Sequence, residues 1–132
     1  MIDDRPAIGV VRVAVIAAVL GSLLAAAAQP VLAHHSYSVY DSSKRMTLSG
    51  KIVGVAFQNP HVNVSLDTGE RVWRLDMPGP RRLTARGLTT EILQVGRTLE
   101  VVGWPNRSGS ADFAPVQMTV GGNTFEIRRE GR

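Results

Sequence analysis

Cysteine is absent from the chain. This absence excludes disulfides, thiolate metal sites and cysteine nucleophiles, so packing alone must hold the folded chain together. Three common catalytic motifs are also missing, namely the GxSxG nucleophile elbow, the HExxH zinc helix and the phosphate-binding loop. We therefore expect a protein that is not an enzyme. A Ser–His hydrolase built on the few histidines is the catalytic alternative.

Lysine is scarce, because only Lys44 and Lys51 occur and arginine supplies the rest of the basic charge. The formal net charge is +4 at pH 7. Inside a cell such a balance would suggest nucleic acid. The leader described next points outside the cytoplasm, where anionic lipid, polysaccharide and acidic protein are the available partners. We expect no nucleic-acid partner, and the simplest reading of the charge is solubility.

Residues 1–33 have the pattern of a cleavable signal peptide. Two arginines precede a continuously apolar run at 13–28, and Val31-Leu32-Ala33 supplies the small residues that signal peptidase accepts. The run is shorter than the roughly 20 residues of a spanning helix. We predict cleavage between Ala33 and His34 and a periplasmic or secreted protein with no stable membrane span. An uncleaved anchor is the alternative.

The rest of the chain is predicted to be a polar segment at 34–45, one β-rich domain at 46–129 and a frayed tail at 130–132. Short apolar alternations separated by turn residues predict strands. The expected strands are 46–57, 61–67, 70–76, 97–104, 113–120 and 124–129. Glycines at 50 and 54 predict bends in the first strand.

A short helix is expected between the third and fourth strands. It starts near Pro80, ends before Gly87 and buries Leu83. Three strands, a helix and two strands is the order of the OB-fold, a five-stranded Greek-key barrel. The predicted class is all-β with a small α contribution, an OB-like antiparallel barrel of five to six strands preceded by a signal-peptide helix. An open sandwich or a helix-capped meander is the alternative.

All three histidines lie in two short motifs, and this concentration predicts a metal site. Cleavage before His34 would let its α-amine and imidazole chelate one ion, because the amine pKa is near 8. His35 could bind instead through the amine and the intervening amide, and His61 could add an imidazole. Nitrogen donors favour copper, then zinc or nickel. Alternatively, His34 and His35 are a polar, flexible start and His61 caps a turn.

A second candidate site follows from the OB topology, in which the loops after strands one and four lie on the ligand-binding side. This places Asn59, His61, Arg107 and Trp104 in one neighbourhood. Trp73 could stack a ligand from the third strand. The simpler interpretation of Trp73 and Trp104 is that both are core aromatics.

The motifs AHHSYSVYD, TLSGKIVGVAFQNPHV and GRTLEVVGWPNRSGS resemble a family of small exported bacterial proteins of unknown function. Members carry a mature N-terminal His-His-Ser segment and an Asn-Pro-His turn, and the resemblance covers nearly all of the mature domain. It departs at Arg97, where aspartate is common, and in a shorter turn between strands two and three. The matching positions are His34, His35, Ser36, Tyr40, Asp41, Gly50, Asn59, Pro60, His61, Trp73, Gly96, Gly103, Arg107 and Gly109.

The resemblance implies a Gram-negative periplasmic protein with a small β-barrel and implies no established activity. Our leading interpretation is a non-catalytic periplasmic binding module that holds a small ligand, a metal ion or a partner at the end carrying Asn59, His61 and Arg107. One alternative is a copper-handling protein that uses the mature N-terminal His34. The other is a structural accessory subunit of an envelope complex.

Overall fold

Strand β1 (Met46–Ala56) is long enough to serve two neighbours in the computed structural model, which describes residues 37–129. Its first half pairs with β4 (Thr98–Pro105) and its second half with β2 (Val62–Asp67), both antiparallel. The change of partner requires a bend. Gly50 permits it, since a Cβ there would collide with the Asp67 carbonyl oxygen, and a register shift follows before Gly54. The irregularity predicted at Gly54 is therefore confirmed, and at Gly50 the structure shows a close approach to β2.

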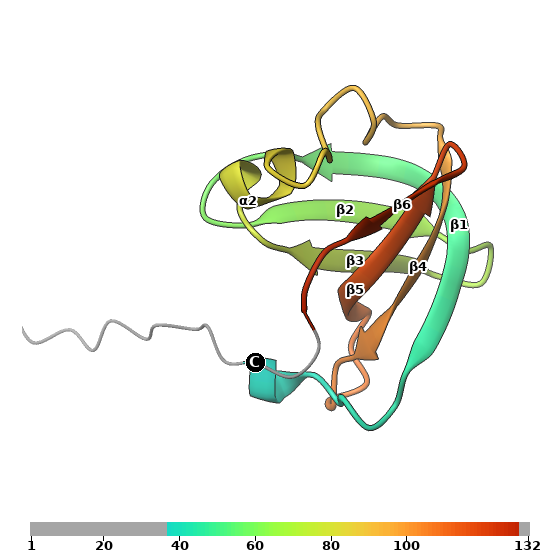
Figure 1. The fold of residues 1–132 in the computed structure, drawn as a ribbon. Coiled ribbons are helices and arrows are strands. Elements are labelled where there is room, and N and C mark those ends of the chain that lie inside the picture. Colours follow the sequence, from blue (N-terminus) through green and yellow to red (C-terminus); the bar gives the residue numbers. More distant parts are fainter. Residues whose placement is uncertain (1–36, 130–132) are drawn as a thin grey trace, which may run out of the picture. The chain divides into compact units, whose positions relative to one another are not determined.

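The barrel closes where β3 (Val72–Met77) meets β5 (Asp112–Val120). The strand order is β3-β2-β1-β4-β5, and β6 (Asn123–Glu126) is added outside β5 (Figure 1). This confirms the OB-like barrel. The β3–β5 pairing is parallel, so the barrel is mixed instead of antiparallel throughout. A closed ring with an odd number of strands must contain at least one parallel pair.

The helical elements are short. Helix α2 (Pro80–Thr84) lies between β3 and β4 as predicted, and a 3-10 turn, η1 (Tyr37–Val39), precedes β1. Pro80 begins α2, and Gly87, with φ of +85°, turns the chain after it. No helix among residues 37–129 is long and apolar enough to cross a membrane.

The first five strands match their predicted ranges to within two residues. The sixth ends three residues early, because the amides of Ile127 and Arg128 both donate to the Val116 carbonyl and the ladder stops there. The predicted signal peptide, His34, His35 and the tail at 130–132 lie outside the described residues.

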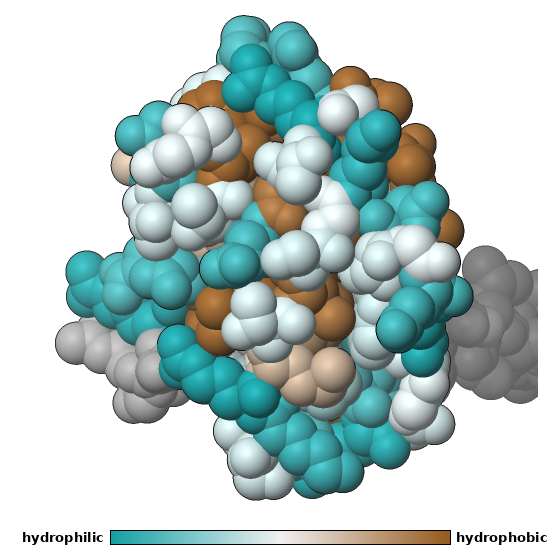
Figure 2. Space-filling view, turned by 90° about the vertical axis from the view of Figure 1, so that its right-hand side faces the viewer, coloured by the Kyte–Doolittle hydropathy of each residue, from teal (hydrophilic) through white to brown (hydrophobic). Residues whose placement is uncertain are grey.

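The core fills the barrel and extends under α2. Alternate residues of β2 face inward and are fully buried, and Leu83, Leu88 and Leu93 join the same cluster from α2 and the turns after it. On the face shown in Figure 2, hydrophobic areas are separated by hydrophilic side chains. That face therefore offers no broad apolar docking surface.

Candidate functional site

The loop between β1 and β2 places His61 beside the end of β3. A Cβ on Gly79 would lie 2.6 Å from the Pro60 carbonyl oxygen, so this loop packs directly on the backbone that follows β3. The amide of Val62 donates to the Pro78 carbonyl at 3.3 Å. Only glycine at position 79 allows this approach, which brings His61 next to Asp76.

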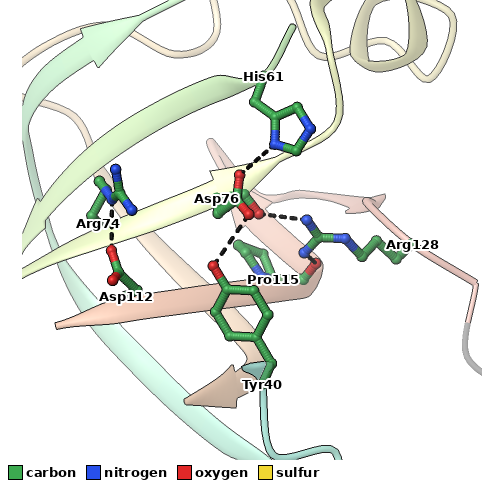
Figure 3. A network of polar contacts seen from close by, with 7 residues as sticks. All are labelled: Tyr40, His61, Arg74, Asp76, Asp112, Pro115 and Arg128. Carbon is green, nitrogen blue, oxygen red and sulfur yellow. Dashed lines mark hydrogen bonds and ion pairs between the residues drawn. The ribbon is translucent and has the colours of Figure 1, made fainter. Parts of the chain in front are cut away.

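Asp76 is the centre of a polar cluster on the outer side of the barrel (Figure 3). On β3, Leu75 and Met77 are buried, so the alternation turns Asp76 outward. Its Oδ1 lies 2.8 Å from Nδ1 of His61, and its Oδ2 accepts a hydrogen bond from the Tyr40 hydroxyl at 3.1 Å. We call Tyr40, His61 and Asp76 the Asp76 cluster.

The cluster fixes the histidine tautomer. A carboxylate only accepts hydrogen bonds, so Nδ1 of His61 carries the proton that is donated to Asp76. The imidazole keeps 26% of its side-chain surface exposed and Asp76 keeps 19%. Burial, and then the neighbouring Asp76 carboxylate, raise the pKa of Tyr40 well above its usual value. Tyr40 therefore stays a neutral donor.

Tyr40 belongs to a short segment, residues 38–41, which we call the N-terminal strap. The strap lies along the loop after β4, where Tyr40 forms a bridge with Asn106 and the Asp41 amide donates to Pro105. Arg107 donates twice to the strap, from its amide to Val39 at 2.8 Å and from Nε to the Ser38 carbonyl at 3.0 Å. The strap thus joins this loop to the Asp76 cluster.

Asp41 secures the end of the strap. Its carboxylate accepts a 2.6 Å hydrogen bond from the Ser43 hydroxyl and lies 3.6 Å from Arg107. The Ser43 hydrogen bond is the main reason that the pKa of Asp41 is lowered, and the charges of Arg107 and Lys44 add to it.

The β3–β5 seam beside the cluster has only two backbone pairs, and two arginines strengthen it. Arg74 binds Asp112 across it at 2.6 Å. Arg128 is buried and donates to the carbonyls of Asp76 on β3, at 2.7 Å, and Pro115 on β5, at 3.0 Å. Burial would raise the pKa of Asp112, but the bonds from Ser110 and Arg74 together lower it.

The residues predicted for the ligand site lie in different surroundings. Asn59 is exposed in the β1–β2 loop, and Arg107 is linked to His61 through the strap and Asp76. Trp73 faces inward, where its ring meets Phe113 edge-on at 5.8 Å.

Trp104, on β4, lies on the other side of the barrel wall. Its neighbour Gly103 is buried, whereas Trp104 is half-buried on the outward side and is not among the residues packed against the core. The simpler interpretation as a core aromatic therefore holds for Trp73 and not for Trp104.

Sequence reasoning did not find the roles of Tyr40, Asp76 and Arg128. In the sequence Asp76 looks like one of several charges on the outer face of a strand. Its outward position, two residues after Arg74, does follow from the alternation of β3. The motif Tyr40-Asp41 belongs to the resemblance and was the one available signal for the strap.

Metal ligation within residues 37–129 would be incomplete, because these residues contain no group of three His, Cys, Asp or Glu side chains able to hold an ion. His61 with Asp76 supplies one oriented imidazole. Further donors would have to come from elsewhere, and His34 and His35 lie outside the described residues.

The fold and the cluster define a class: a small OB-like barrel with an N-terminal strap and an oriented surface histidine. The chain belongs to a family of unknown function, DUF6152, whose match covers residues 20–114. That span includes the strap, the Asp76 cluster and the loop carrying Arg107. A comparison with curated proteins found no match.

Proposed function

We propose that the protein is exported through its signal peptide and acts in the periplasm as a non-catalytic module that binds a transition-metal ion, copper(II) by preference. The observation that carries the proposal is the 2.8 Å contact between Nδ1 of His61 and Asp76. A metal-binding histidine usually donates its other N–H to a carboxylate or carbonyl, which orients the ring and increases its basicity. Tyr40, bonded to the same carboxylate, limits the rotation of Asp76.

The remaining donors in this proposal are the α-amine and imidazole of His34, created by cleavage after Ala33. Arg107 holds the Ser38 carbonyl, and four residues of chain reach at most about 14 Å. A short tether of this kind supports delivery of the amine to the barrel surface. His35, with the amine and the intervening amide, offers a second binding mode.

Copper is favoured because amine and imidazole nitrogens bind it most tightly among the common divalent ions. Binding should be best near neutral pH and should be lost on acidification, because protons compete for the amine and the imidazoles. Export and activation would then be coupled, since the amine of His34 becomes available only after cleavage.

The test is a calorimetric copper(II) titration of protein purified from the periplasm. His61→Ala should weaken binding without unfolding the domain, which circular dichroism would check. Asp76→Asn should weaken it about 10- to 100-fold, because the ring loses its orienting carboxylate. Asp67→Asn, at the exposed end of β2, is the matched control and should bind like the wild type.

The N-terminus is tested separately. One extra residue before His34 should weaken binding by displacing the amine, and mass spectrometry of the purified protein should find His34 first. Equal affinity across all variants, or no binding by the wild type, would contradict the metal proposal. The small-ligand, partner-binding and accessory-subunit alternatives would then take its place.

A further inference from the structure

The short helix after β3 and the turn that follows it carry a cluster of arginines that the metal proposal does not use. From Met77 to Thr90 the chain contains three arginines and no acidic residue. These residues, Arg81, Arg82 and Arg86, are all exposed, and we call them the α2 arginines. Figure 1 shows α2 on the outside of the barrel, beyond the end of β3. The cluster is therefore accessible to a large partner.

The core holds this segment in place. Leu83 and Leu88, which precede and follow Arg86 in the chain, are fully buried. The guanidinium of Arg86 also donates to the backbone carbonyls of Glu126 and Ile127 at the end of β6. A carbonyl orients a guanidinium but carries no charge that would neutralise it. The three positive charges are therefore kept close together on a firm support.

The neighbouring carboxylates do not offset this charge. In the part of the chain that the structure describes, no carboxylate forms an ion pair with any of the α2 arginines. Of the acidic residues that flank the segment, Asp76 binds His61 and Tyr40. Glu91 accepts a hydrogen bond from the Thr90 hydroxyl at 3.1 Å. A counter-charge for the α2 arginines therefore has to come from solvent ions or from a partner.

The other end of β3 carries charges of both signs. Asp67, which pairs with Val72 at the start of β3, lies opposite Lys51 of β1. Glu70 and Arg71 follow in the turn between β2 and β3. These two positive and two negative side chains cancel formally. The positive charge of the barrel is therefore concentrated near α2, and this end is the one that an anionic surface would attract.

We propose that the α2 arginines bind the surface of a membrane that contains anionic phospholipid. A guanidinium can bind two oxygens of a phosphate at once, and each basic residue near such a surface strengthens binding roughly fivefold. The other exposed side chains between Arg81 and Arg86 are only Thr84 and Ala85. A protein interface usually has an apolar, desolvated centre, so this segment suits a layer of phosphates better than an acidic protein. The inference does not rest on the metal proposal.

The test is co-sedimentation of protein purified from the periplasm with vesicles that contain phosphatidylglycerol and with vesicles of pure phosphatidylcholine. The protein should bind the first and not the second, and about 1 M salt should abolish binding, because charges are then screened beyond roughly 3 Å. Replacing Arg81 and Arg82 together by glutamine should weaken binding about 20- to 30-fold, since two fivefold contributions are lost. Thr84→Arg, at an exposed position of the same helix, should strengthen it about fivefold.

The matched control replaces Lys51 and Arg97 by glutamine, which removes the same charge from exposed positions at the other end of β3. It should weaken binding less than about threefold, because these charges lie farther from the membrane than the screening length. Equal weakening by the two double variants would show a response to net charge alone and would overturn the proposal. So would equal binding to both kinds of vesicle, or no binding to phosphatidylglycerol. Binding to polyglutamate without binding to vesicles would assign the α2 arginines to an acidic protein and would also overturn it.

Discussion

Replacing the buried Arg128 by methionine should destabilise the barrel more than replacing any of the exposed arginines. The guanidinium donates to Asp76 on β3 and to Pro115 on β5, where the two strands share only two backbone pairs. Hydrogen bonds from a charged group contribute about 1.5–3 kcal/mol each. Methionine keeps the apolar stem but leaves both carbonyls without this donor.

The net loss is smaller than the sum of two such bonds. Burying a guanidinium costs desolvation energy that methionine avoids. We therefore expect the free energy of unfolding to fall by about 2–4 kcal/mol, a large part of the roughly 5–15 kcal/mol available to a small domain. For a domain of this size the melting temperature should drop by about 10–25 °C. Arg128→Lys should lose about half as much, because one ammonium cannot reproduce the planar fork.

Urea unfolding followed by circular dichroism measures this difference. Arg97→Met is the control, since Arg97 is exposed, and its unfolding free energy should stay within about 0.5 kcal/mol of the wild type. The dependence on urea should keep the same slope in all variants, because the surface exposed on unfolding is unchanged. An Arg128→Met protein as stable as the Arg97→Met protein would refute the role of Arg128 at the seam.

Three further predictions concern the site. The pKa of Tyr40 is raised, so its contribution to stability is complete below about pH 10 and is lost as the pH rises further; Tyr40→Phe should flatten that alkaline fall in urea unfolding. The pKa of Asp112 is lowered, so its contribution is complete above about pH 4 and is lost as the pH falls; Asp112→Asn should flatten the acid limb of the same profile. Gly79→Ala should cost about 1–3 kcal/mol, because its Cβ would lie 2.6 Å from the Pro60 carbonyl oxygen, and it should weaken copper binding by moving His61. A Gly79→Ala protein with wild-type stability would show that the β1–β2 loop can move away from residue 79 at no cost, and would contradict the tight packing described for it.

The barrel could be predicted because its pattern is local. Val62, Val64 and Leu66 alternate with polar residues in the sequence, and all three are fully buried in β2. Pro80 and Gly87 mark the start of the helix and the turn after it in the sequence. The order of strands and helix then indicates the OB topology. Each of these signals depends on residues a few positions apart.

The Asp76 cluster could not be predicted, because its contacts depend on register. His61 meets Asp76 only since Asn63 pairs with Asp76 across β2 and β3, and a shift by one residue would turn Asp76 into the core. Tyr40 depends on the strap, which is held partly through backbone groups that any sequence possesses. The parallel pairing of β3 with β5 could not be predicted either, because it follows from closure of the whole ring and not from the sequence of either strand.

The position of Arg128 in the chain also determines when the β3–β5 seam can be braced. The donor that bridges β3 and β5 stands 52 residues after Asp76, and every strand of the ring precedes it in the chain. A polypeptide made from its N-terminus can form the β1–β2–β3 meander early and can pair β3 with β5 once residues 112–120 exist, but the Arg128 hydrogen bonds across that pairing must wait for residue 128. The Arg128 contacts across the β3–β5 seam are therefore among the last that a growing chain can form.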